Sequence, residues 1–175
     1  MKDFVGKTAV VTGAASGIGR AVSLALADRG VQLVLADVAV DALEAVRAEV
    51  EARGVEAIDV VTDVTEKTSV EALADAAWDR FGAVHIIHNN AGVLIRAPML
   101  DAEEKDWEWI LAVNLWGVIH GVHAFAPRML EAGEEGHIIN TASEAGHFAG
   151  DLYGVYNTSK FAVVGLTESL SLIHI

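Results

Sequence analysis

Short apolar segments alternate along the chain with longer segments in which apolar residues recur at helical spacing. The short ones are mostly rich in Val and Ile and predict five strands, at residues 8–12, 32–36, 57–62, 84–88 and 137–141. Two apolar sets between them share helix faces: Val40, Leu43, Val46 and Val50, and Val70, Leu73, Ala74, Ala77 and Phe81. Thr68 and Glu71 predict a capping box in the second helix. The alternation predicts one three-layer α/β/α domain with a parallel sheet.

The apolar content fits such a sheet, whose strands are buried on both faces. Apolar residues make up 53% of the chain and the mean hydropathy is +0.38. The longest segment without a formal charge, residues 110–127, approaches the length that spans a bilayer. It contains Asn114, His120 and His123, which would be costly in lipid. We therefore predict a buried helix in a cytoplasmic protein that does not enter the membrane.

Charge and cysteine content exclude several other classes of protein. The 175 residues suit one domain with a sizeable core, and the absence of cysteine excludes disulfides and thiolate metal sites. The net charge of −13 argues against nucleic acid as a partner, because a phosphate backbone requires a basic surface.

The first predicted strand leads directly into Thr12-Gly13-Ala14-Ala15-Ser16-Gly17-Ile18-Gly19, and a helix is predicted to follow. Glycine lets the backbone turn tightly and approach a pyrophosphate, whose charge is attracted by the free N–H groups of the helix. The spacing is G-x-x-x-G-x-G instead of the standard G-x-G-x-x-G, and many such turns need glycine only for packing. The strand before it, the helix after it and a later acidic residue favour a dinucleotide site.

That acidic residue is Asp37, which follows the second predicted strand. Its carboxylate can accept hydrogen bonds from the adenosine ribose hydroxyls and would repel a 2′-phosphate. Ala14, Ala15 and Val38 supply no cation for such a phosphate. The sequence therefore favours NAD over NADP. The alternative is that Asp37 caps the next helix, a purpose compatible with the first.

Two further loops follow predicted strands at the edge where open α/β sheets bind ligands. Asp63 and Val64 follow the third strand and are expected beside the adenine. Asn89-Asn90-Ala91-Gly92 follows the fourth strand, and its small residues would let the backbone pass close to the cofactor. The alternative for Asn89 and Asn90 is stabilisation of the turn by side-chain hydrogen bonds to the backbone.

Tyr156 and Lys160 are spaced so that a helix would present both side chains on one face. A tyrosine hydroxyl ordinarily titrates at about pH 10. A neighbouring ammonium group and a positive nicotinamide stabilise the phenolate and so favour proton transfer at neutral pH. A Y-x-x-x-K pair alone often occurs by chance. Its significance here comes from the cofactor motif, from Asn114 upstream, and from Ser143 directly after the fifth strand.

With these residues the chain resembles the short-chain dehydrogenase/reductase family. The resemblance rests on motifs that cover nearly the whole chain in order: T-G-A-A-S-G-I-G (12–19), N-N-A-G (89–92), V-N-L-W-G (113–117), I-I-N-T-A-S (138–143) and Y-N-T-S-K (156–160). It implies a Rossmann-type, doubly wound sheet and reversible hydride transfer between NAD and a secondary alcohol or ketone. The resemblance does not identify the substrate.

The resemblance also implies roles for individual residues. Tyr156 would be the general acid/base, and Lys160 would make its hydroxyl more acidic and bind the nicotinamide ribose. Ser143 would hydrogen-bond the substrate oxygen, and Asn114 would hold a water in a proton relay to solvent. The expected cofactor-binding residues are Gly13, Ser16, Gly17, Ile18, Gly19, Asp37, Asp63, Val64, Asn90, Ala91, Gly92, Tyr156 and Lys160.

Other residues are expected to have no catalytic role. Tyr153 has Asn157 where a lysine would be needed, so it is expected only to line the substrate pocket. The apolar helix at 110–127 and the Tyr156 helix fit the subunit interfaces of the family, which implies a homodimer or homotetramer. Ordinary core packing is the alternative explanation of their apolar faces.

The histidines do not predict a metal site. His85 and His88 have an odd spacing on a strand and point to opposite faces. His120 and His123 can share a helix face, but the sequence offers no third ligand.

Family members continue beyond the tyrosine helix with further strands, so the resemblance implies a C-terminally truncated member that lacks them. Leu-Ser-Leu-Ile-His-Ile at residues 170–175 matches the translated end of a transposon-based sequencing adapter. We therefore expect residues 1–169 to form an incomplete NAD-binding domain and residues 170–175 to be an artefact. A natural terminus is the alternative.

Two functions compete with catalysis by an NAD-dependent oxidoreductase. A dinucleotide-binding redox sensor would need no acid/base pair, so Tyr156 and Lys160 disfavour it. An inactive fragment would describe the chain as written, but not a longer parent protein.

Overall fold

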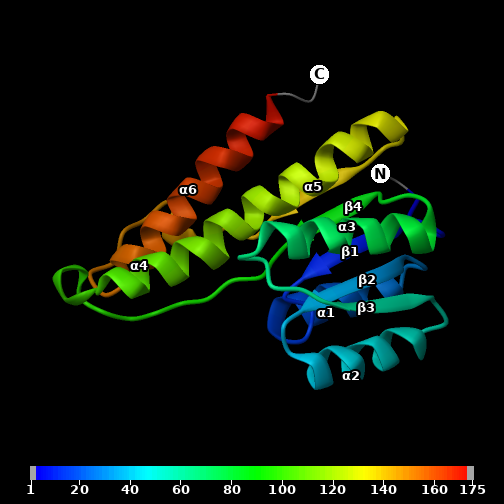
Figure 1. Cartoon of the computed structure of the whole chain (residues 1–175), viewed down its shortest axis with the longest axis horizontal. Helices are drawn as coiled ribbons and strands as arrows, with labels where there is room; N and C mark the ends of the chain where they lie inside the picture. Colours follow the sequence, from blue (N-terminus) through cyan, green and yellow to red (C-terminus); the bar gives the residue numbers. More distant parts are fainter. Residues whose placement is uncertain (1–2, 173–175) are drawn as a thin grey trace.

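Five parallel strands form the centre of the computed structural model, which describes residues 3–172 (Figure 1). They are β1 (Thr8–Thr12), β2 (Gln32–Asp37), β3 (Ala57–Val61), β4 (Ile86–Asn89) and β5 (His137–Asn140). Their order across the sheet is β3-β2-β1-β4-β5. The chain therefore builds outward from β1 to β3, crosses back, and continues with β4 and β5 on the other side of β1. This reversal confirms the predicted doubly wound parallel sheet.

Helices cover both faces of the sheet, as predicted. Those on one face are α1 (Gly17–Ala27) and α2 (Val40–Glu51). Those on the other face include α3 (Lys67–Phe81) and α5 (Gly117–Ala132). Alternate residues of a strand point to opposite faces, so neighbouring residues of β1 contribute to different cores. Val11 packs with the α1 and α2 side, whereas Val10 packs with the α3 and α5 side.

The remaining helices lie near one end of the sheet (Figure 1). α4 (Glu104–Leu111) continues into α5 through η2 (Ala112–Trp116), a wider π-helical segment. α6 (Gly154–Ser171) packs against α4 and η2. Two short 3-10 helices, η1 (Met99–Asp101) and η3 (Glu144–Gly146), interrupt the loops.

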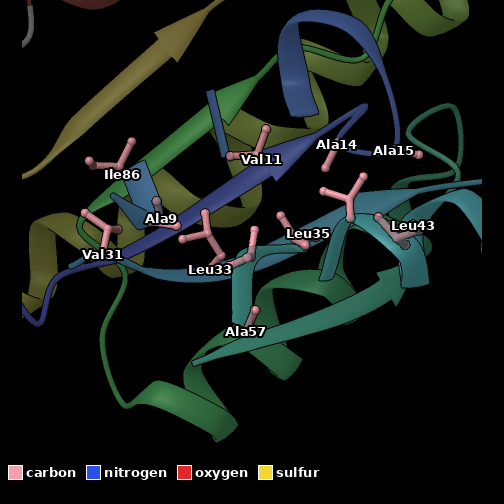
Figure 2. Close-up of a cluster of buried hydrophobic side chains, with 13 residues drawn as sticks. Ala9, Val11, Ala14, Ala15, Val31, Leu33, Leu35, Leu43, Ala57 and Ile86 are labelled. Carbon is pink, nitrogen blue, oxygen red and sulfur yellow. The ribbon is translucent and has the colours of Figure 1, made fainter. Parts of the chain in front are cut away.

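The core on the α1 and α2 side is built from small and branched apolar side chains. Figure 2 shows Val11 of β1 beside Leu33 and Leu35 of β2, with Leu43 of α2 packed over them. All four side chains are fully buried. Burial of each large apolar side chain stabilises the fold by roughly 1.5–3 kcal/mol. The four residues lie in two of the predicted strands and on the predicted apolar face of the helix that follows the second strand.

Some local predictions were wrong. The capping box at Thr68 and Glu71 does not form, because α3 begins earlier, after Glu66, and Glu71 pairs with Lys67 instead. Val40 was expected on the buried face of α2, but it is the first residue of that helix and is 52% exposed.

The helical segment Glu104–Ala132 consists of α4, η2 and α5. By length and composition alone it could span a membrane. Core helices of soluble proteins meet the same criteria, so the evidence for a membrane is weak. Phe125 and Met129 on this segment pack against the sheet, while Trp109 and Trp116 are about half exposed. The segment is therefore buried along one face, so the predicted buried helix is confirmed for that face only.

The C-terminal end of the described region contains an exposed strand and a long helix. Among residues 3–172, β5 pairs only with β4, and Ile139 on it is 44% exposed. α6 runs through the boundary predicted after residue 169 and ends at Ser171. Residues 173–175 lie outside the described residues. The assignment of 170–175 as an artefact remains a prediction, which the encoding DNA sequence would test.

Close packing of α5 on β4 leads to a prediction about stability. A β-carbon at Gly121 of α5 would overlap the buried side-chain amide of Asn89 at the end of β4. Gly121→Ala should therefore lower the free energy of unfolding by about 1–3 kcal/mol through overpacking. Urea denaturation measures the change.

Gly165→Ala in α6 is the matched control, since a β-carbon there meets nothing within 4 Å. Alanine is the better helix former, so this variant should be neutral or more stable by up to about 1 kcal/mol. Equal unfolding free energies for the two variants would show that the contact between α5 and β4 is not tight.

Candidate active site

A cavity of about 720 Å³ lies at the carboxyl ends of the strands, where the sheet order reverses. Loops that follow β1, β2, β3 and β4 form most of its wall, and α6 closes one end. The expected cofactor residues that line it are Gly13, Ser16, Gly17, Ile18, Asp37, Asp63, Val64, Asn90, Ala91, Gly92, Tyr156 and Lys160. The structure therefore brings together residues as far apart in the sequence as Gly13 and Lys160. Gly19 is the exception and lies beneath the wall.

The glycine-rich loop can approach a ligand closely because two of its glycines have left-handed backbone conformations. The φ angles are +65° at Gly13 and +50° at Gly17. A β-carbon at Gly13 would lie 2.9 Å from the Cα atom of Ala91, whereas one at Gly17 would meet nothing within 4 Å. Gly13 therefore allows two loops to touch, and Gly17 leaves open space before the start of α1. Such a helix start fits a pyrophosphate.

Gly19 has a packing role instead of a contact with the cavity. A β-carbon there would overlap the carbonyl group of Gly13. Gly19 therefore permits α1 to pack under the loop. A role in packing alone was the alternative given for the glycines of this motif.

Asp37 joins the glycine-rich loop to the start of α2. Its Oδ2 atom accepts a hydrogen bond of 3.0 Å from the Ala15 N–H, and its Oδ1 atom accepts one of 3.1 Å from the Ala39 N–H. The residue at the N-cap position of α2 is Ala39, so the prediction that Asp37 caps this helix was wrong. Asp37 instead closes a turn before the helix and presents its carboxylate to the cavity. These bonds fix the position of the carboxylate at the cavity wall.

Thr12 and Asn90 tie the loops after β1 and β4 together. The Asn90 side-chain amide donates to the Thr12 carbonyl oxygen at 2.9 Å. The Thr12 hydroxyl oxygen accepts from the backbone N–H groups of Asn90 at 2.9 Å and Ala91 at 3.0 Å. Asn90 therefore stabilises the turn, as the alternative proposed, and also borders the cavity. The two interpretations are compatible.

Lys160 lies almost completely buried at the end of the cavity formed by α6, with 4% of its surface exposed. Its Nζ atom donates to the Thr141 carbonyl oxygen at 2.7 Å and lies 5.7 Å from the centre of the Tyr156 ring. Burial lowers the pKa of Lys160 below the ordinary lysine value of 10.5. The positive charge is therefore held beside the tyrosine in a poorly solvated place, where its effect on a neighbouring oxygen is strong.

Asn114 is fully buried in η2 and does not line the cavity. Its Oδ1 atom accepts from the Val93 N–H at 2.8 Å, and its Nδ2 atom donates to the Val93 carbonyl at 2.9 Å and to the Ser159 hydroxyl at 3.1 Å. Both amide N–H groups are therefore engaged by protein. The visible role of this side chain is to hold Val93 in the cavity wall and to join η2 to α6.

Ser143 also lies outside the cavity wall, at the start of η3. Its hydroxyl oxygen accepts a hydrogen bond of 3.1 Å from the Ala145 N–H. The buried side chain of Asn157 donates to the Ala145 carbonyl at 2.9 Å and to the Phe148 carbonyl at 2.6 Å. Asn157, next to Tyr156 on α6, therefore fixes the loop that carries Ser143. This positioning role was missed at the level of sequence.

The ring of Tyr153 lies under the guanidinium of Arg96, whose central carbon is 5.3 Å from the ring centre. Tyr153 does not line the main cavity.

Several residues that line the cavity were not expected from the sequence. They are Val38, Thr62, Thr65, Val93, Leu94, Trp109, Val113 and Thr141. Position at the carboxyl end of a predicted strand would have indicated Thr62 and Thr141. Trp109 and Val113 come from α4 and η2, and no sequence signal places those helices over the cavity.

Three of the histidines considered as metal ligands bond to protein groups. His85 Nε2 lies 2.8 Å from Glu134, His88 Nε2 lies 2.8 Å from the Thr141 hydroxyl, and His120 Nδ1 lies 3.0 Å from a backbone carbonyl. Within residues 3–172, no three His, Asp or Glu side chains converge on a metal-sized site.

Comparison with known proteins identifies the family to which this fold and cavity belong. The model of the short chain dehydrogenase family matches residues 7–174. The chain belongs to this family. A short chain dehydrogenase/reductase from Burkholderia phymatum, solved in complex with NAD, is 49% identical and superposes with a TM-score of 0.95. That match covers 97% of this chain and 60% of the other.

Other short chain dehydrogenase relatives show the same pattern of coverage. SadH of Mycobacterium tuberculosis, named as an oxidoreductase, is 42% identical over 97% of this chain and 61% of its own length. An alcohol dehydrogenase from the archaeon Thermococcus sibiricus, solved with 5-hydroxy-NADP, is 32% identical with a TM-score of 0.90. It is matched over 95% of this chain and 70% of its own. The chain thus spans about 60% of the length of the first two relatives.

The buried ammonium of Lys160 should leave a signature in the pH dependence of stability. Its pKa is lower in the folded protein than in the unfolded chain, so the folded state binds this proton less tightly. As the pH rises from neutral toward 10.5, the wild type should gain stability relative to Lys160→Met. The gain is about 1.4 kcal/mol for each unit by which the pKa is lowered.

Urea denaturation at a series of pH values measures this difference. Lys67→Met is the control, because Lys67 is largely exposed and paired with Glu71. A stability difference between wild type and Lys160→Met that stays constant with pH would contradict the burial of a charged lysine.

Proposed function

We propose that this short chain dehydrogenase catalyses NAD-dependent hydride transfer between a secondary alcohol and the corresponding ketone. The observation that supports it most strongly is the buried Lys160 held beside Tyr156 at one end of a cavity whose other end contains Asp37. An acid/base pair at the reacting end and a ribose-binding carboxylate at the adenosine end fit one dinucleotide bound between them.

In the proposed reaction, the nicotinamide supplies or accepts the hydride when it is bound. The Tyr156 hydroxyl donates a proton to the substrate oxygen during reduction and accepts it during oxidation. Lys160 stabilises the phenolate left on Tyr156, and because its ammonium is buried this stabilisation is only weakly screened by water. Ser143 would hydrogen-bond the substrate oxygen. Its present partner, the Ala145 N–H, leaves its own O–H free to donate.

Asn114 contributes through the backbone it supports. Its side chain fixes Val93 in the cavity wall and keeps the π-helical turn of η2 against α6. π-helical turns are frequent at functional sites. A water relay at this residue would have to use atoms other than the two amide N–H groups.

NAD is the proposed cofactor, with NADP less favoured. Asp37 presents a negative charge where the 2′-phosphate of NADP would lie, and the neighbouring Val38 supplies no cation. The Burkholderia phymatum relative was solved with NAD, which agrees, whereas the Thermococcus sibiricus relative was solved with 5-hydroxy-NADP. The two relatives were thus solved with different nicotinamide dinucleotides. The further proposals are a small-molecule substrate, a homodimeric or homotetrameric assembly and a cytoplasmic location.

The first test concerns the cofactor. The wild type should bind NADH more tightly than NADPH, and Asp37→Ala should weaken NADH binding by about 10- to 100-fold, since hydrogen bonds to a charged group are lost. The preference over NADPH should largely disappear. Fluorescence titration measures both affinities. Asp41→Ala, an exposed carboxylate in the first turn of α2, is the control and should change neither. Tighter binding of NADPH by the wild type would refute the assignment.

The second test concerns the proton. Tyr156→Phe should lower the rate of ketone reduction by 10²- to 10⁴-fold, which is roughly the contribution of general acid/base catalysis. Its affinity for NADH should stay close to that of the wild type. Tyr153→Phe is the control and should keep most of the rate. Turnover is measured with this chain extended by the C-terminal region of the Burkholderia phymatum relative, and a Tyr156→Phe rate above about a tenth of wild type argues against the role.

A non-catalytic dinucleotide-binding protein gives a different outcome in the same experiments. Such a protein would bind NADH, and Asp37→Ala would weaken that binding. The extended chain would show no turnover with any alcohol or ketone. The buried Lys160 beside Tyr156 favours the enzyme, because burial of an ammonium group is costly and a sensor has no use for it.

A further inference from the structure

His88 is a buried polar residue that follows two buried isoleucines in β4. The isoleucines are Ile86 and Ile87, the strand lies next to the centre of the sheet, and only 5% of the surface of His88 is exposed. Its Nδ1 atom is buried and has no hydrogen-bond partner among residues 3–172. A buried nitrogen without a partner costs about 1–3 kcal/mol. An apolar side chain would therefore suit this position better if packing were its only role.

The other ring nitrogen of His88 makes a short hydrogen bond whose direction can be assigned. Nε2 lies 2.8 Å from the Thr141 hydroxyl oxygen, and the Thr141 hydroxyl lies 3.3 Å from the Asn90 side-chain oxygen, to which it donates. A hydroxyl has one proton to donate. Thr141 must therefore accept from a protonated Nε2 of His88. Burial lowers the pKa of His88, which keeps the ring neutral and leaves this single donor.

Thr141 connects His88 to both sides of the cofactor cavity. Its hydroxyl holds the side chain of Asn90, whose amide in turn donates to the Thr12 carbonyl in the glycine-rich loop. Its carbonyl oxygen accepts the 2.7 Å hydrogen bond from Lys160. The Thr141 hydroxyl therefore contacts the loop after β4, and the Thr141 carbonyl contacts the proposed catalytic Lys160.

We propose that His88 is a positioning residue of the cofactor site, which acts through Thr141 to hold Asn90 and Lys160 in place for the dinucleotide. This inference rests on the proposed function of the cavity. His88 does not line the cavity itself, and the hydrogen bond of its ring that leads toward the cavity is the one to Thr141. The buried Nδ1 atom without a partner lowers the stability of the fold. In the proposed role, the gain is that the hydrogen bond from Nε2 orients Thr141 for cofactor binding.

The role predicts opposite effects on stability and binding, which a purely structural residue would not give. His88→Leu removes the orphan nitrogen and the donor together, so the urea midpoint should stay the same or rise. NADH affinity should fall by about 3- to 10-fold, the value of one hydrogen bond. His88→Gln restores a donor near the position of Nε2, and its NADH affinity should lie within about twofold of wild type. His123→Leu, at an exposed histidine of α5, is the control and should leave affinity unchanged.

A double-mutant cycle tests whether the effect passes through Thr141. In a Thr141→Val background the acceptor of the His88 bond is absent, so His88→Leu should cause no further loss of NADH affinity. Fluorescence titration with NADH and NADPH, with urea denaturation of each variant, provides all the measurements.

The outcomes separate this inference from the proposed function. Unchanged NADH affinity in His88→Leu, or additive losses in the double-mutant cycle, would overturn the role of His88 while the cofactor assignment stands. Loss of both stability and affinity in His88→Leu, without recovery in His88→Gln, would show a packing role and also overturn it. If the wild type binds neither NADH nor NADPH, both the proposed function and the inference fail.

Discussion

The close contact between the loops that follow β1 and β4 is the constraint on which the site depends. Gly13 touches the backbone of Ala91, and Thr12 bonds to both Asn90 and Ala91. These two strands are neighbours at the point where the order of the sheet reverses, so their loops diverge above the sheet. Hydrogen bonds hold the two loops together close to the sheet, and the cavity begins where the loops separate. Its floor is therefore set by main-chain geometry that only a residue without a β-carbon can adopt at position 13.

The polar residues around this contact are buried at a cost and are held by backbone groups. Lys160 bonds to the Thr141 carbonyl, Asn114 to both backbone groups of Val93, and Asn157 to the loop that carries Ser143. Such bonds fix side-chain positions before any ligand arrives, which lowers the entropy that binding must overcome. Burial of the Lys160 ammonium, which lowers its pKa, is an unfavourable contribution that accompanies this order. At Lys160 the burial that fixes the geometry of the site therefore lowers the stability of the fold.

The sequence was sufficient for features that depend on local pattern. Apolar runs located all five strands, and the glycine spacing with Asp37 identified residues that line one cavity. It was insufficient where long-range packing decides. Trp109 reaches the cavity only because α4 lies over it, and the supporting bonds of Asn114 depend on a π-helical turn that no local signal announced. The capping box failed for a similar reason, since α3 begins at Lys67, ahead of the predicted cap.

The proposed function allows cofactor binding and substrate selection to be separated in this fold. Every residue that lines the cavity lies between Gly13 and Lys160, within the part that the structure describes, so NADH binding is a property this chain can be tested for directly. The relatives extend over a longer chain, and here the apolar side chains of Ile139 and Phe148 are exposed near the β5 end of the sheet. On the proposed function, contacts that select the substrate therefore need not involve the residues that line this cavity. On the proposed function, the site for hydride transfer would be assembled from these residues without reference to the remainder of the substrate, because chemistry in this family resides in a site and not in the fold as a whole.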